Sequence, residues 1–169
     1  MTEKPTYSKG LAGIIAGETS ISTVGKEGLG LSYRGYSVSD LSKDSGFEEV
    51  SYLLIYGKLP TKEELKSYFE LFHQHRKLPK ELKQMLELLP KSSIGMDVLR
   101  TTCSFLGSLE PESKNFSDPK EINSQWNVAN RLIGIFGPAL LYWHHFHNSG
   151  VRIETQTKKT DSIAMNFCR

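Results

Sequence analysis

The sequence of 169 residues lacks most of the features of secreted, membrane-bound or nucleic-acid-binding proteins. Its two cysteines, Cys103 and Cys168, are too few for a disulfide framework and fit a reducing cytoplasm. It has neither the apolar core of a signal peptide near its start nor a run of eighteen apolar residues. Its 21 basic and 19 acidic residues leave a net charge of only +2, whereas nucleic acids and membrane surfaces select a one-signed patch. We therefore predict a cytoplasmic protein with no membrane or nucleic-acid partner.

The first 36 residues are rich in glycine and form the first of three predicted parts. Two short pieces with strand-like composition, residues 19–24 and 31–34, flank the turn sequence GKEGLG, so we expect a small β-hairpin. A phosphate-binding loop is the alternative for this glycine cluster. It would need a G-x-G-x-x-G after a buried strand or a G-K-[ST] ending, and the sequence has neither here. The hairpin is therefore the preferred interpretation.

Residues 37–164 form the second predicted part, and their apolar periodicity is helical. Gly57 is a natural helix stop, Thr61 and Glu64 have the spacing of a capping box, and Pro79 suits the start of a helix. The polar, proline-containing segment 110–121 predicts a loop. The fold class is therefore mainly α, and the expected helices cover residues 37–43, 47–57, the segment between Thr61 and Pro79, 79–90, 96–109 and 121–148.

The longest expected helix, 121–148, carries apolar residues at alternating spacings of four and three. Pro138 lies inside it and removes a backbone hydrogen bond, so we expect a kink there. If no further chain covers this helix, it should expose an apolar patch that favours association. The residues expected in that patch are Trp126, Phe136, Leu140, Trp143 and Phe146.

Three histidines stand within four residues near the end of this helix: His144, His145 and His147. A metal site is one interpretation, but His145 points about 100° away from the face that the other two share. The sequence offers no H-E-x-x-H frame and no nearby cysteine to complete such a site. Histidines at a helix C-terminus suit the helix dipole and can cap free carbonyls. We therefore prefer a structural role, and we interpret His73 and His75 as solvated side chains.

Other candidate groups also have simple structural interpretations. Arg34 stands between two tyrosines, which favours stacking on their rings, with anion binding as the alternative. Cys103 lies within a predicted helix and is expected to be a small packed side chain rather than a nucleophile. Asp97 is expected in the first turn of its helix, where the dipole favours a carboxylate. The residues alone thus give no catalytic constellation.

Four blocks stand in order along the chain: GLAGIIAGETSISTVGKEGLGLSYRGYSVSDL, FEEVSYLLIYGKLPTKEEL, MDVLRTTCSFLG and LLYWHHFHNSGVRIETQT. They resemble the N-terminal part of the citrate synthase family, and within it the bacterial 2-methylcitrate synthases, over about residues 7–164. The resemblance implies part of the large helical domain of a homodimer. It also implies an acyltransferase that condenses propionyl-CoA or acetyl-CoA with oxaloacetate, with no cofactor besides the acyl-CoA substrate.

The resemblance also implies where the chemistry lies. In the family one histidine and one aspartate enolise the thioester, and another histidine polarises the oxaloacetate carbonyl. These groups belong to blocks beyond residue 169, so no catalytic, cofactor-binding or metal-binding residue is carried over to this chain. Ile94 and Gly95 replace a usual His-Pro pair, and residues 165–169, the third part, diverge, leaving a short helix that buries little. We therefore expect a truncated chain, with an inactive N-terminal fragment or helical interaction module as the alternative function.

Overall fold

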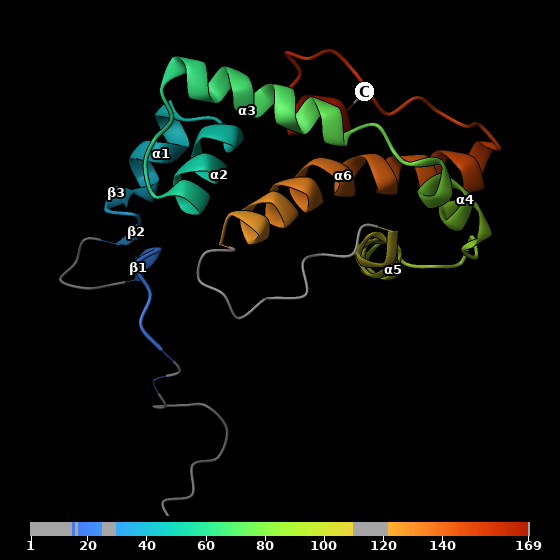
Figure 1. Ribbon diagram of the computed structural model, residues 1–169, viewed down its shortest axis with the longest axis horizontal. Coiled ribbons are helices and arrows are strands. Elements are labelled where there is room, and N and C mark those ends of the chain that lie inside the picture. The colour runs from blue at the N-terminus through green and yellow to red at the C-terminus, as the bar shows by residue number, and fades with distance from the viewer. Residues whose placement is uncertain (1–14, 16, 25–29, 110–121, 169) are drawn as a thin grey trace, which may run out of the picture.

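The computed structural model describes residues 15, 17–24, 30–109 and 122–168 of the chain. Within these residues it contains seven α-helices and one three-stranded antiparallel sheet (Figure 1). The sheet and the first two helices lie at one end of the molecule, and the long helix α6 (Ile122–Ser149) runs through its centre. The mainly helical fold class predicted from the sequence is confirmed.

The sheet joins β1 (Ser22–Val24), β2 (Leu31–Tyr33) and β3 (Tyr36–Ser37) in that order. Strands β1 and β2 pair antiparallel, as the predicted hairpin requires. Turn residues 25–29 lie outside the described part of the chain. The sequence analysis missed β3, which follows β2 through Arg34 and Gly35 with φ of 49° and 89°. Two successive residues with positive φ form the tight turn that suits the twist of a hairpin.

Local signals set the limits of the next helices. Helix α1 spans Val38–Asp44, and α2 spans Phe47–Tyr56 and ends at Gly57, which adopts φ of 81°. Helix α3 spans Lys62–His75 and begins with the predicted capping box. There the Glu64 amide donates to Thr61 Oγ1 at 3.2 Å and the Thr61 amide to Glu64 Oε2 at 2.8 Å. Helix α4, Lys80–Leu88, follows Pro79.

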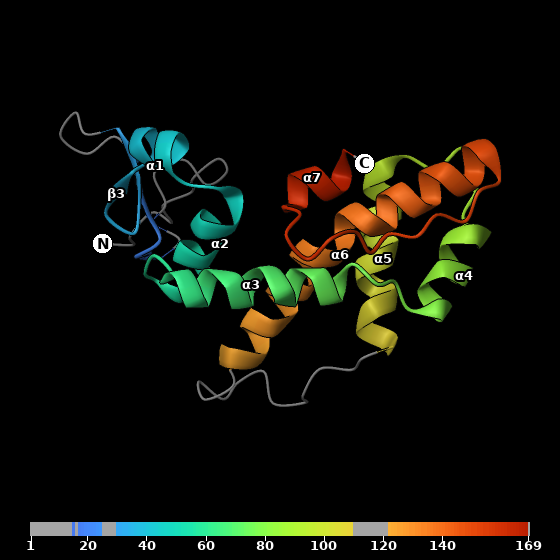
Figure 2. The same cartoon turned by 90° about the horizontal axis from the view of Figure 1, so that it is seen from above.

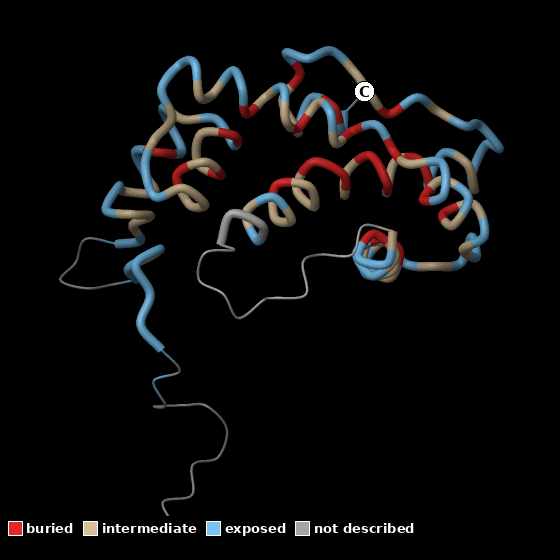
Figure 3. The backbone as a smooth tube through the Cα atoms, in the orientation of Figure 1, coloured by how far each residue is buried: buried red, intermediate tan, exposed pale blue. Residues whose placement is uncertain are grey.

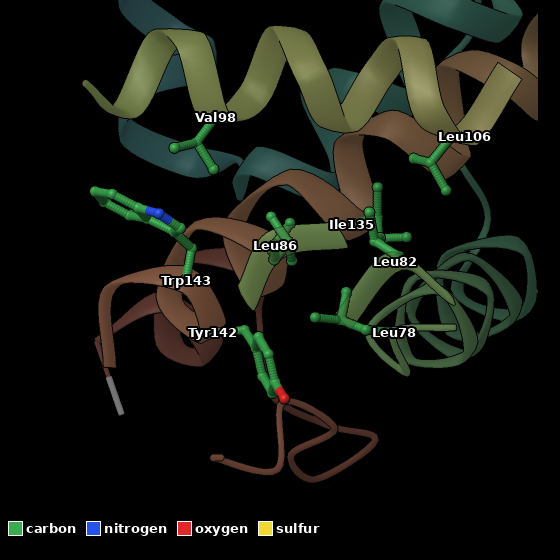
Figure 4. Close-up of a cluster of buried hydrophobic side chains, with 9 residues drawn as sticks. Leu78, Leu82, Leu86, Val98, Leu106, Ile135, Tyr142 and Trp143 are labelled. Carbon is green, nitrogen blue, oxygen red and sulfur yellow. The ribbon is translucent and has the colours of Figure 1, made fainter. Parts of the chain in front are cut away.

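The hydrophobic core lies where α4 and α5 (Gly95–Leu109) pack on α6. Figure 4 shows side chains from the three helices, and from the connection that leads into α4, meeting in this core. The buried residues are Leu78, Leu82, Leu86, Val98, Leu106, Ile135, Ala139, Tyr142 and Trp143. Burial is therefore concentrated along the middle and second half of α6 (Figure 3).

Helix α6 contacts α3, α4, α5 and α7 (Ile163–Phe167), so it has neighbours on several sides. Its path changes direction near the middle, as Pro138 predicts (Figure 1). The prediction that this helix exposes an apolar patch is wrong, because Trp143 is buried and the other four side chains expected in the patch are half-buried. The side chains expected in that patch are Trp126, Phe136, Leu140, Trp143 and Phe146.

After α6 an extended segment, residues 151–161, runs back along α4 and α3 toward α7 (Figure 2). We call this segment the strap. Helix α7 begins at Ser162, whose hydroxyl accepts from the Met165 amide at 3.1 Å. This short helix was predicted to bury little. One of its side chains, that of Asn166, is nevertheless buried and donates to Thr155 O at 3.0 Å. The division into residues 1–36, 37–164 and 165–169 stays a prediction.

Candidate functional site

The histidines near the end of α6 do not converge. His144 and His145 are exposed, whereas His147 is half-buried and its Nε2 lies 3.1 Å from Leu86 O, a carbonyl that can only accept. Leu86 is in the last turn of α4, and its carbonyl also accepts from the Leu89 amide at 3.4 Å, so His147 binds the C-terminal end of α4 rather than that of its own helix. In the part of the chain that the structure describes, no three histidine, cysteine or acidic side chains are placed to hold a metal ion.

The prediction that His73 and His75 are solvated is wrong. His73 Nε2 donates to Thr157 O in the strap at 2.9 Å, and the Gln156 side chain donates to His73 O at 3.2 Å. His75 is half-buried against α6, where Gly134 leaves room for it. These contacts join residues far apart in sequence, so helical periodicity could not reveal them.

Arg34 has a structural role, but through hydrogen bonds. Its guanidinium donates to Ser20 Oγ at 2.8 Å and to Leu54 O, in the last turn of α2, at 2.9 Å. The side chain thus ties the hairpin to the C-terminal end of α2. Asp97 lies in the first turn of α5, as expected, and pairs with Arg100 at 2.9 Å.

The expectation that Cys103 is packed is wrong, because both Cys103 and Cys168 are exposed. The buried residues of α5 are Val98, Thr102 and Leu106, which recur every four positions. Cys103 follows Thr102 by one residue and is therefore turned about 100° away from that buried row.

The sequence analysis missed a buried charged cluster made by Arg76, Glu48 and Asp161, which are 1%, 3% and 2% exposed. Arg76 donates to Asp161 O at 2.7 Å, and Asp161 Oδ2 accepts from the Lys158 amide at 3.1 Å. Burial lowers the pKa of Arg76, while the charges of Asp161 and Glu48 oppose that change. Glu48 Oε1 accepts from the Ile163 amide at 2.7 Å, at the start of α7. The cluster therefore fixes where the strap ends and α7 begins.

A second charged group fixes the other end of the strap. Arg152 binds Glu87 through two hydrogen bonds of 2.8 Å, and the Tyr142 hydroxyl donates to Glu87 Oε1 at 2.6 Å. The hydrogen bond from Arg152 is the main cause that lowers the pKa of Glu87 to about 2. Burial, together with Glu87, raises the pKa of Tyr142 to about 12. Both groups thus keep their usual charge at neutral pH.

Aromatic side chains of α2 and α3 meet α6 around Asn130, which is fully buried. Tyr68 donates to Asn130 Oδ1 at 2.7 Å, and the Asn130 amide donates to Tyr56 Oη at 2.8 Å. Burial raises the pKa of Tyr68, and a hydrogen bond from Lys58 lowers the pKa of Glu64 to about 2. A hollow of about 410 Å³ opens beside these rings, lined by Tyr52, Tyr56, Glu63, Glu64, Ser67, Tyr68 and Leu71.

The perturbed pKa values described above do not suit proton transfer at neutral pH. A general acid or base works best when its pKa lies near the working pH. Here the pKa values of the two carboxyl groups, Glu64 and Glu87, are lowered from their ordinary value, and those of Tyr68 and Tyr142 are raised, so all four move away from neutral pH. The perturbed groups therefore act as fixed hydrogen-bond partners that position helices, rather than as a catalytic pair.

Comparison with known proteins identifies the fold. The sequence model of the family described as "Citrate synthase, C-terminal domain" matches residues 10–169. The chain belongs to the citrate synthase family. It is 46% identical to the 2-methylcitrate synthase of Shewanella oneidensis over 164 residues, which are 97% of this chain and 42% of that protein. It is 37% identical to the citrate synthase of Synechocystis over 73% of this chain and 31% of that protein.

Solved citrate synthases have the same arrangement of helices. The enzyme from Thermotoga maritima superposes with a TM-score of 0.78 at 31% identity, covering 95% of this chain and 40% of that one. The ternary complex of the Thermoplasma acidophilum enzyme with carboxymethyl coenzyme A and oxaloacetate superposes with a TM-score of 0.74 at 26% identity. This match covers 92% of this chain and 39% of that one. The chain thus spans about two fifths of the length of these relatives. None of the described helices combines the length and apolar character needed to cross a bilayer.

Proposed function

We propose that this chain is part of a cytoplasmic enzyme that condenses an acyl-CoA, propionyl-CoA or acetyl-CoA, with oxaloacetate to give 2-methylcitrate or citrate. The 46% identity to a 2-methylcitrate synthase over 97% of the chain carries the proposal. The exposed free thiols of Cys103 and Cys168 suit a reducing compartment. The proposed reaction uses the acyl-CoA as a substrate and needs no further cofactor.

Within that enzyme we assign this chain the role of a helical frame. Abstraction of a proton next to a thioester carbonyl needs a base, and the carboxylates of Glu64 and Glu87 are poor bases because their pKa values are about 2. We propose that the bond-making groups belong to the remaining length of the synthase. The charged clusters at Arg76 and Glu87 support this role, because they hold the strap and α7 in fixed positions on the helices.

A domain exchange tests the proposal. Residues 10–162 of this chain replace the matching segment of the Shewanella 2-methylcitrate synthase, and release of free CoA thiol is followed with oxaloacetate and either acyl-CoA. We expect turnover with at least one acyl-CoA, and the ratio of kcat/KM values then gives the acyl preference. A folded chimera with no turnover, beside an active parent enzyme, would contradict the proposal.

The second candidate function is an inactive fragment that acts as a helical interaction module. The coverage of two fifths of the relatives favours it for this chain taken alone. The domain exchange distinguishes the two roles, because only a helical frame supports turnover in the chimera, whereas an assay of the purified chain with oxaloacetate and propionyl-CoA tests both. The helical-frame assignment predicts no thiol release by the chain alone, and turnover above background would overturn both that assignment and the inactive fragment.

We also propose a homodimer, with the outward face of α5 as a contact surface. Helix α5 covers one side of α6 and lies at an edge of the molecule (Figure 1). Met96 is 72% exposed on this helix, and Cys103 is exposed about two turns later. In a dimer, Cys103 should react with a thiol reagent more slowly than Cys168. Sedimentation as a monomer with equal labelling of both thiols would count against the dimer.

A further inference from the structure

A cavity of about 440 Å³ lies between α3 and the strap, on the side of α3 away from the aromatic hollow. Lys66, Phe69 and Glu70 line it from the helix, and Lys159 and Thr160 line it from the strap. Positions 66, 69 and 70 share one helical face because they are three and four residues apart. The volume is within the range of small-molecule sites in proteins.

The charged side chains that border this cavity are exposed and belong to both α3 and the strap. Among the described residues, neither ammonium group nor the Glu70 carboxylate takes part in an ion pair. Two ammonium groups and one carboxylate leave a net charge of +1 around the half-buried ring of Phe69. Such a site favours a ligand with a single negative charge at one end and an apolar body that covers the ring.

The strap side of the cavity is held in place by buried groups. Lys159 and Thr160 form a turn that closes through a bond of 3.1 Å from the Asp161 amide to Lys158 O. The buried Arg76 side chain donates to Asp161 O at 2.7 Å, and the Lys158 amide donates to Asp161 Oδ2. Since both ends of the turn are fixed, Lys159 meets the facing helix without a large loss of backbone freedom when a ligand binds.

We propose that this cavity binds an amphiphilic monocarboxylate, with the carboxylate between Lys66 and Lys159 and the aliphatic chain against Phe69. The site is separate from the proposed condensation and does not depend on it. Binding joins α3 to the strap through the ligand and so fixes the strap more tightly. A dianion is disfavoured because the Glu70 carboxylate faces the same space.

Sodium octanoate is a suitable probe, followed by amide chemical shifts of the isotope-labelled chain. We expect saturable shifts at residues 66–70 and 159–160. Octan-1-ol, with the same chain but no charge, and acetate, with the charge but no chain, should bind at least about tenfold more weakly. No saturation with octanoate, or equal shifts with octanol, would overturn the proposal.

Variants separate the site from general attraction of anions. Combining Lys66→Gln with Lys159→Gln should weaken octanoate binding about tenfold, and Glu70→Gln should strengthen it about threefold, on the scale of exposed ion pairs. The matched control combines Lys62→Gln with Lys80→Gln, two exposed lysines outside the cavity lining. Equal weakening by the test pair and the control pair would mean non-specific anion binding and would refute the site.

Discussion

Glu87 is the carboxylate that joins the strap to the helical core. Its pKa of about 2 in the folded protein lies below the ordinary 4.5, so its ionised form stabilises the fold. We expect Glu87→Gln to lower the unfolding free energy by about 1 kcal/mol at pH 7, through lost charged hydrogen bonds. The deficit should be complete above pH 4.5 and shrink as the pH falls toward 2, where Glu87 in the parent protein becomes protonated.

Urea denaturation of the parent and the variant at several pH values measures this deficit. Glu81→Gln is the control, since Glu81 is exposed in the first turn of the same helix. A deficit that stays constant from pH 7 to pH 3 would show that Glu87 does not act through its charge.

Arg76 compensates two buried carboxylates, Glu48 and Asp161, so its loss should be far more damaging than that of a surface arginine. We expect Arg76→Met to lower the unfolding free energy by about 3 kcal/mol, because buried negative charge is left without its counter-charge. Arg100→Met should cost less than about 1 kcal/mol, since its pair with Asp97 is exposed. Thermal unfolding of the two variants compares them, and similar losses would contradict the importance assigned to the cluster.

At the residue scale, the sequence revealed contacts only where both partners were near in the chain. The Thr61 and Glu64 pair was predictable because a capping box has a fixed spacing. The bond from His73 to Thr157 spans 84 positions, so no local pattern contained it. The roles of Glu48 and Arg76 were missed for the same reason, since their partners lie in the strap and α7.

At the scale of elements, the N-terminal caps of α3 and α1 allow a matched test of helix capping. Thr61 accepts from the Glu64 amide at the start of α3, whereas Ser37 makes no side-chain bond at the start of α1. Thr61→Ala should lower the unfolding free energy by about 1 kcal/mol, and Ser37→Ala should change it by less than about 0.5 kcal/mol. Chemical denaturation of both variants measures the difference, and equal effects would mean that the box contributes nothing.

The close approach of α3 and α6 depends on Gly134. A Cβ atom at this position would lie 2.8 Å from His75 Cβ, closer than van der Waals contact allows. Gly134→Ala should therefore lower the unfolding free energy by about 1–3 kcal/mol, even though alanine favours a helix.

Gly107 in α5 provides the control, because a Cβ there meets nothing within 4 Å. Gly107→Ala should raise the unfolding free energy by about 0.5–1 kcal/mol through helix propensity alone. Stabilisation by both substitutions, measured by urea denaturation, would show that α3 and α6 separate easily at this crossing.

Most helices could be predicted from the sequence because their ends carry local signals. Gly57, Thr61 and Pro79 each stand at a helix boundary, and the observed limits agree closely with the expected ones. Strand β3 was missed because two residues are too few for a period to be visible. The burial of Cys103 was predicted wrongly because the sequence shows the period of α5 but not which neighbouring face the packing covers.

On the scale of the whole molecule, exposed apolar side chains flank the connection between α4 and α5. Leu88 is 85% exposed, Ile94 63% and Met96 72%. We expect concentration-dependent light scattering by the purified chain, and replacing Leu88 and Ile94 by lysine should reduce it. Val24→Lys, at another exposed apolar position, is the control. Equal reduction by both changes would mean that the association is not localised at this connection.

The bond from the Ile163 amide to Glu48 also sets an order of events during protein synthesis. The two residues are 115 positions apart. At translation rates of roughly 5–20 residues per second, Glu48 is added to the chain about 6–23 s before its partner is made. Throughout that interval the Glu48 carboxylate must remain hydrated, so the surface of α2 that carries it cannot yet pack against the start of α7. The nascent chain therefore reaches its packed form only after α7 has been translated, and chaperones have several seconds in which to bind the open face.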